Sequence, residues 1–151
     1  MITQAEIIQI LSGFVGTLGF AVLFNIRGKR FLFGGIGGFL SWSLFVLFSR
    51  FLPSEPVNYF LVAMLISAYA EIMARVLKTP TTTFITISLI PLIPGGSLYY
   101  TMAYAFESKS ALFLEKGVYT LKLAAALALG IIITTTATRI FYSFRNRRRT
   151  S

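Results

Sequence analysis

The sequence predicts an all-α integral membrane protein with about five transmembrane helices, the fourth of which is broken. Of its 151 residues, 56% are hydrophobic and only 13% are charged, and the mean hydropathy is +0.76. So little polar surface does not cover a soluble globule of this size. The apolar segments are each about 20 residues long, which is the length of helix that crosses a bilayer. We expect a single transmembrane domain over residues 1–151.

The first two predicted spans, at about 6–26 and 31–51, carry small residues on one side of the helix. On the first span these residues are Ser12, Gly13, Gly16 and Gly19, and on the second span Gly34 and Gly38 form a Gly-x-x-x-Gly pair. Small residues at such spacings allow another helix to approach closely. We therefore expect both helices to pack tightly against neighbouring helices.

Of the residues in the third predicted span, at about 57–78, Glu71 and Arg75 cost the most free energy to insert into a bilayer. They lie one helical turn apart and therefore share a face of the helix. A lone charge near the centre of a bilayer costs roughly 2.5–3.5 kcal/mol on insertion scales, so it is retained when paired, hydrated or functional. Either the pair neutralises itself near the cytoplasmic end, or Glu71 faces a cavity at the broken helix and there couples a proton or orients a substrate amine.

The fourth predicted span, at about 81–106, is broken at Pro91–Gly96. The two prolines of this stretch lack a backbone donor and clash with the preceding turn, and its two glycines reach conformations closed to other residues. Backbone groups freed at membrane depth need partners, so such a break is tolerated where it is buried in protein or lines a wet cavity. Broken helices of this kind point to the binding site of a transporter.

A second half-helix, at about 98–106, is expected to follow the break, with Ser97 as its cap. The N-terminus of this half-helix carries free backbone N–H groups and a partial positive charge, which suit a carboxylate. The predicted substrate-binding residues are Pro94, Gly95, Gly96, Ser97, Tyr100 and Arg75, and Glu71 is the proton-coupling candidate.

Residues typical of helix starts and turns mark the boundaries of the remaining predicted helices. Thr79 is expected to cap the start of the fourth span, with Pro80 in its first turn. A short interfacial helix at about 111–115 and a turn at Gly117 are expected to precede the last span, at about 118–142. That last span carries Ala126, Gly130 and Thr134 at four-residue spacing, a further face for close packing.

The net charge of +9 marks topology, and we expect no nucleic-acid partner. With the N-terminus outside, ten basic residues fall on the cytoplasmic side: Arg27, Lys29, Arg30, Arg75, Lys78, Arg139, Arg145, Arg147, Arg148 and Arg149. Arg50, Lys109, Lys116 and Lys122 fall outside. The positive-inside rule therefore selects N-out and C-in with an odd number of spans. The cluster at 145–149 anchors this topology, and it also suits anionic lipid head groups.

The composition argues against an enzyme. The chain has no cysteine and no histidine, which removes thiol chemistry, histidine bases and the usual zinc clusters. Glu71 is the only acid expected within the membrane, and no nucleophile and base accompany it. We expect no catalytic residue, no metal and no cofactor.

The stretch Pro91–Tyr100, preceded by Glu71–Arg75 and Lys78–Pro80, resembles the threonine/serine exporter family. The chain is most similar to the small, stand-alone form of that family's C-terminal membrane half. This resemblance implies a multi-pass protein of the bacterial plasma membrane, a separately encoded larger partner subunit, and alternating access. It also implies export of small hydrophilic acids, either threonine and serine or dicarboxylates such as succinate.

Two other functions remain open. A self-sufficient homo-oligomeric carrier would use the same break without a larger subunit. A non-transporting membrane scaffold would stabilise a partner through its glycine faces, but a scaffold has no need of a break within a span.

Overall fold

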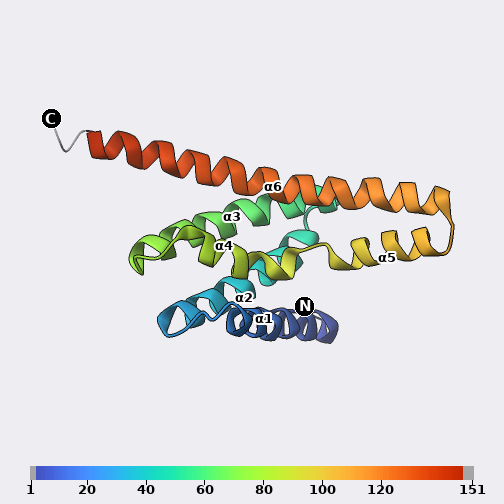
Figure 1. The fold of residues 1–151 in the computed structure, drawn as a ribbon, viewed down its shortest axis with the longest axis horizontal. Coiled ribbons are helices and arrows are strands. Elements are labelled where there is room, and N and C mark those ends of the chain that lie inside the picture. The colour runs from blue at the N-terminus through green and yellow to red at the C-terminus, as the bar shows by residue number, and fades with distance from the viewer. Residues whose placement is uncertain (1–2, 148–151) are drawn as a thin grey trace.

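The computed structural model describes residues 3–147, which form six α-helices and one 3-10 helix. These elements are α1 (Gln4–Leu23), α2 (Lys29–Ser49), α3 (Glu55–Val76), α4 (Thr81–Leu89), η1 (Ile90–Leu92), α5 (Gly95–Phe106) and α6 (Ser110–Arg147). Figure 1 shows α6 running the length of the molecule, with α3 beside it and α1 on the far side of the bundle. No strand occurs within the described range, so the all-α class is confirmed.

Four helices, α1, α2, α3 and α6, are long and apolar enough to cross a membrane. The pair formed by α4 with η1 and by α5 makes a fifth candidate if the two parts are one span. Helices α1, α2 and α3 begin and end within three residues of the predicted spans. Residues 148 and 149 of the predicted basic anchor lie outside the described residues.

The C-terminal ends of α1, α3 and α5 share one turn in which a non-glycine residue has positive φ. These residues are Asn25, Lys78 and Ser108, with φ of 54°, 49° and 56°. At the end of α3 the next N–H, that of Thr79, donates to the Ala74 carbonyl over 2.8 Å, and the Thr79 hydroxyl donates to Leu77. Thr79 therefore closes α3 in a Schellman motif. The prediction that it caps α4 was wrong, because Pro80 takes that position.

The glycines of α2 allow the close packing that the sequence predicts. A Cβ on Gly34 would collide with the Ile87 side chain of α4, and a Cβ on Gly38 would collide with Thr17 of α1. The stripe predicted on α1 is used only in part. Gly13 lies against Trp42, but a Cβ on Gly16 or on Gly19 would meet no atom within 4 Å. The second half of the α1 stripe therefore contacts no other helix of the described chain.

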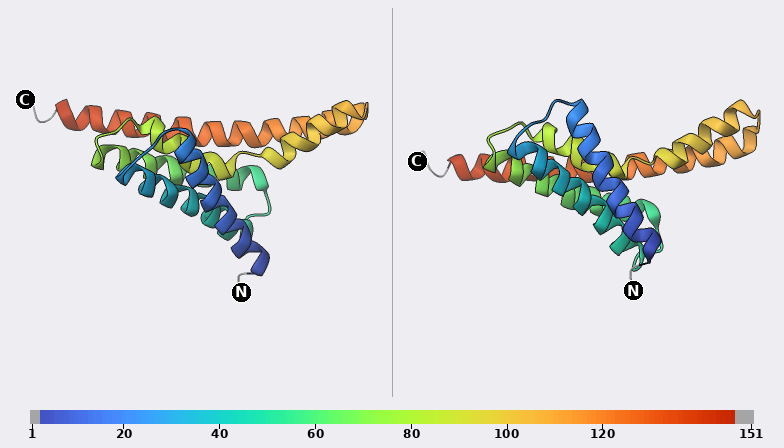
Figure 2. Two further views of the ribbon diagram at one scale, coloured as in Figure 1. Left: turned by 60° about the horizontal axis from the view of Figure 1, so that its bottom comes forward. Right: turned by 90° about the horizontal axis from the view of Figure 1, so that it is seen from below.

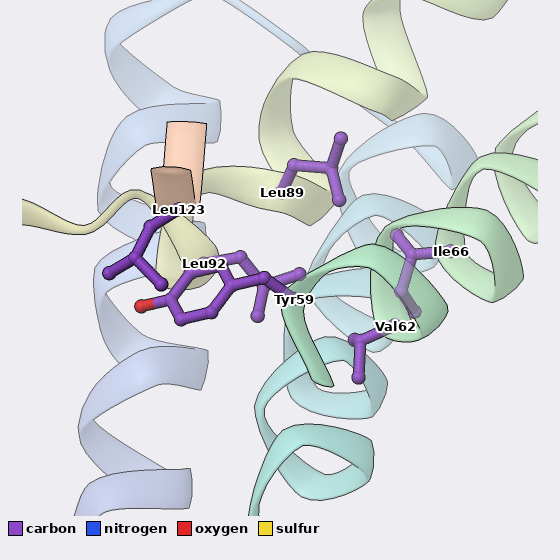
Figure 3. Close-up of a cluster of buried hydrophobic side chains, with 6 residues drawn as sticks. All are labelled: Tyr59, Val62, Ile66, Leu89, Leu92 and Leu123. Atoms are coloured by element: carbon purple, nitrogen blue, oxygen red, sulfur yellow. The ribbon is translucent and has the colours of Figure 1, made fainter. Parts of the chain in front are cut away.

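The main apolar core lies where α3, the end of α4 and α6 meet. It comprises Tyr59, Val62, Ile66, Leu89, Leu92 and Leu123, all at most 5% exposed (Figure 3). Leu92 belongs to the broken segment, so the core holds the last turn before the break in place. On its other side α3 is joined to α2 by the Asn58 amide, which donates to the Phe45 carbonyl over 3.0 Å.

Helix α6 is one continuous helix of 38 residues. The predicted interfacial helix at 111–115 and the turn at Gly117 were therefore wrong. A glycine inside a helix costs about 0.8–1.0 kcal/mol relative to alanine, which tertiary packing readily outweighs. Here Gly117 faces α5, where a Cβ would lie 3.4 Å from Thr101 Cγ2, and the hydroxyls of Thr101 and Thr120 are 3.1 Å apart. Gly117 permits close packing of two helices and does not end one.

The length of α6 gives the molecule a projecting arm. At 1.5 Å per residue α6 is about 57 Å long, whereas the hydrocarbon core of a bilayer is about 30 Å thick. Figure 2 shows α5 and the N-terminal part of α6 extending as a pair beyond the bundle formed by the other helices. We call α5 together with residues 110–122 the α5–α6 hairpin.

Candidate functional site

The helix axis changes direction by 62° between the segment Thr81–Leu92, formed by α4 and η1, and α5. Only Ile93 and Pro94 separate the two helices. The Gly95 N–H donates a hydrogen bond to the Ile93 carbonyl over 2.6 Å, and α5 begins at Gly95. Ser97 therefore lies within the first turn, where its carbonyl accepts a hydrogen bond from Thr101 over 2.8 Å. The prediction that Ser97 caps a helix starting at residue 98 was wrong, because the tight turn after Pro94 starts the helix earlier.

Two backbone donors at the start of α5 are free. The N–H groups of Gly96 and Ser97 donate to no acceptor among residues 3–143, as expected for the first turn of a helix that has no side-chain cap. The positive end of the α5 dipole adds to these donors. This end of α5 is therefore suited to an anionic group, although only two of the predicted residues supply the donors.

An open cleft of about 890 Å³ lies beside these donors. It is formed by the start of α3, the start of α5 and the N-terminal part of α6. Gly96, Ser97 and Tyr100 line it, as do four charged residues, Glu55, Glu115, Lys116 and Lys122. Of the predicted binding residues, Pro94 and Gly95 set the bend next to the cleft without lining it.

Tyr119 joins the charged residues of the cleft. Its hydroxyl donates a hydrogen bond to Glu55 Oε2, and the Lys116 Nζ lies 5.2 Å from the centroid of its ring. The Glu55 carboxylate at the start of α3 is thereby fixed to α6. An arrangement of one fixed carboxylate, two lysines and two free N–H groups can bind a molecule that carries charges of both signs.

Sequence reasoning missed Glu55, Lys116, Tyr119 and Lys122. The last three recur every three residues along α6, a spacing that places side chains close to one face of a helix. The three-residue spacing was visible in the sequence. The turn predicted at Gly117 hid it, because that turn placed Lys116 outside the last helix.

A second hollow, of about 350 Å³, continues from the cleft along the hairpin. It shares Tyr100, Glu115 and Lys116 with the cleft and adds Tyr104 and Leu112, which lie closer to the tip. At the tip itself the Lys109 ammonium contacts the Glu107 carboxylate at 2.7 Å, and this hydrogen bond raises the pKa of Lys109. The two hollows together run from the break along the hairpin as far as Tyr104 and Leu112.

The other predicted site residues lie near the opposite end of α3. The Arg75 guanidinium is 2.9 Å from Glu71 Oε2 and 3.4 Å from the centroid of the Tyr142 ring. The Glu71 side chain is 8% exposed. From residue 55 to residue 71 the helix rises by about 24 Å. The structure therefore does not bring Arg75 or Glu71 to the cleft, and the hypothesis that Glu71 faces a cavity at the break finds no support.

A family model described as Threonine/Serine exporter, ThrE, matches residues 9–137. The matched range includes the break, the cleft and Glu71–Arg75. No curated protein and no solved structure matches the chain.

Proposed function

Because the chain belongs to the threonine/serine exporter family, we propose that it is a membrane subunit of a secondary-active exporter of small hydrophilic acids. The match confirms the family resemblance that the motifs indicated, and the chain is a multi-pass membrane protein of a transporter family. The observation that carries the proposal is the cleft beside the break, where free N–H groups and charged side chains meet.

In this proposal the substrate carboxylate binds at the start of α5. The N–H groups of Gly96 and Ser97 donate to it, and the helix dipole favours its charge. Pro94 and Gly95 hold the bend that aims these donors, and Tyr100 forms one wall of the cleft. Lys122 on α6 supplies a positive charge from the opposite helix.

Transport follows an alternating-access cycle with a larger subunit of the same family. The cleft is open on one side, so a second membrane half is needed to close it. With the N-terminus outside and the C-terminus inside, the cleft lies at the outer end of α3, and the second hollow continues outward along the hairpin. The membrane is the bacterial plasma membrane. A second copy of this chain is the alternative partner.

We propose Glu71 as the proton-coupling residue, because it is the only buried acid of the five in the chain. Glu71→Gln is expected to abolish the dependence of the export rate on pH, since a carboxamide does not ionise over the pH range of the experiment. The rate is measured in vesicles across a pH series. Glu6→Gln is the matched control, because Glu6 also contacts an arginine, Arg50 at 2.6 Å, but its side chain is 24% exposed. If the pH profile of Glu71→Gln is unchanged, Glu71 does not couple a proton, and its ion pair with Arg75 has only a structural role.

The proposed function is tested by efflux from vesicles. Vesicles that contain this chain, with and without the larger subunit, are loaded with labelled threonine, serine or succinate. We expect efflux only when both chains are present. Efflux from this chain alone identifies a homo-oligomeric carrier. A stable complex that transports none of the three solutes contradicts the proposal and favours the scaffold function.

A further inference from the structure

We propose that Glu55, positioned by Tyr119, binds the ammonium group of the substrate and makes the cleft select amino acids over dicarboxylates. This inference rests on the proposed function, because it assigns a second recognition point within the same cleft. The sequence places Glu55 in a turn between two spans and gives no sign of such a role.

The geometry makes Glu55 available to a ligand. It is the first residue of α3, it is exposed, and it lines the cleft together with Gly96 and Ser97. Its Oε2 accepts a hydrogen bond from the Tyr119 hydroxyl. Among residues 3–143, whose side chains are described, none donates a hydrogen bond to its Oε1, which leaves one carboxylate oxygen for a donor in the cleft.

Tyr119 fixes this carboxylate. The residue is only partly exposed, and the next residue, Thr120, is buried against Thr101 of α5. The Lys116 ammonium over the Tyr119 ring restricts the ring further. The carboxylate is therefore held in place before a ligand arrives, which lowers the entropic cost of binding.

The charges of the cleft match a zwitterion. Two acids, Glu55 and Glu115, and two lysines, Lys116 and Lys122, line it, so their formal charges cancel. An amino acid also has no net charge, and its two charged groups can each find an opposite charge in the cleft. A dicarboxylate that bound the free N–H groups with one end would bring its second negative charge to this side of the cleft, towards Glu55. Because Glu55 repels that second carboxylate and attracts an ammonium group, it favours an amino acid over a dicarboxylate in this cleft.

The test compares threonine and succinate in vesicles that contain the intact two-chain complex. Glu55→Gln keeps the shape of the side chain and removes its charge. We expect threonine efflux to fall about tenfold or more at a subsaturating concentration, while succinate efflux stays equal or rises. Tyr119→Phe is expected to shift the same ratio less, because the carboxylate remains but is no longer fixed. Glu55→Asp should restore part of the preference for threonine.

Glu107→Gln is the matched control, because it removes the same charge at the hairpin tip, outside the cleft. It should leave the ratio of threonine to succinate efflux unchanged. An unchanged ratio in Glu55→Gln, or an equal loss for both solutes, overturns the inference and leaves the proposed function intact. A wild-type complex that exports succinate but not threonine also overturns only the inference. A wild-type complex that exports neither solute overturns the proposed function itself.

Discussion

Gly130→Val is expected to destabilise the fold more than the same substitution at a helical glycine that faces open space or the end of a flexible side chain. A Cβ at this position would lie 2.7 Å from the Phe60 carbonyl oxygen and 2.8 Å from Ala63 Cβ. Neither atom can move aside by a change of side-chain rotamer, so α3 and α6 must separate. Inserting extra methyl groups into a packed contact typically costs about 1–3 kcal/mol, and we expect a loss in the free energy of unfolding of about 3 kcal/mol.

The loss should extend to neighbouring contacts between the two helices. One turn beyond Gly130, the Thr134 hydroxyl donates to the Met64 carbonyl over 3.3 Å, and this bond requires the same close approach. The measurement is unfolding of the chain in mixed micelles. Gly16→Val is the matched control, because a Cβ on Gly16 would meet no atom within 4 Å. If the two variants unfold alike, the close contact of α3 with α6 does not determine stability.

Gly96→Val is expected to reduce export at low substrate concentration by about tenfold or more while leaving the fold intact. A Cβ on Gly96 would meet no atom within 4 Å, and its backbone has no positive φ, so the substitution is tolerated sterically. The branched side chain would nevertheless stand at the wall of the cleft, beside a free N–H group. Blocking a hydrogen bond to a charged ligand costs roughly 1.5–3 kcal/mol, so the rate at low substrate concentration should fall by about tenfold or more.

Gly19→Val provides the matched control for this experiment. It makes the same substitution in open space on α1, remote from the lining of the cleft. Both variants should insert into membranes and unfold like the wild-type chain, and only Gly96→Val should show reduced efflux. Normal export by a well-expressed Gly96→Val protein contradicts the assignment of the start of α5 to the substrate carboxylate.

The break and the packing faces could be predicted because their causes are local. Proline lacks a donor wherever it stands, and the missing side chains of Gly34 and Gly38 permit close contact whichever helix approaches. The ends of α1, α2 and α3 followed from the lengths of the apolar runs. The ion pair of Glu71 with Arg75 followed from their spacing alone.

The cleft could not be predicted, because it depends on contacts between distant segments. Gly117 is a turn signal when read alone, and only the approach of Thr101 from α5 shows that the helix continues through it. With the helix interrupted there, Lys116, Tyr119 and Lys122 did not form one face. Glu55 belonged to the cleft only once α3 and α6 were seen to run side by side in the same direction.

Because α6 is uninterrupted, a tilt of this helix about one point would move its two ends in opposite directions. No proline occurs in this helix, and at Gly130 its backbone packs against α3 so closely that a Cβ would collide with the Phe60 carbonyl oxygen. From there Tyr119 at the cleft lies about 16 Å away along the helix, and Tyr142 at the Arg75 contact lies about 18 Å away on the other side. A tilt of about 10° about Gly130 would therefore move the two ends by about 3 Å in opposite directions. Opening at one face of the membrane would then accompany closing at the other.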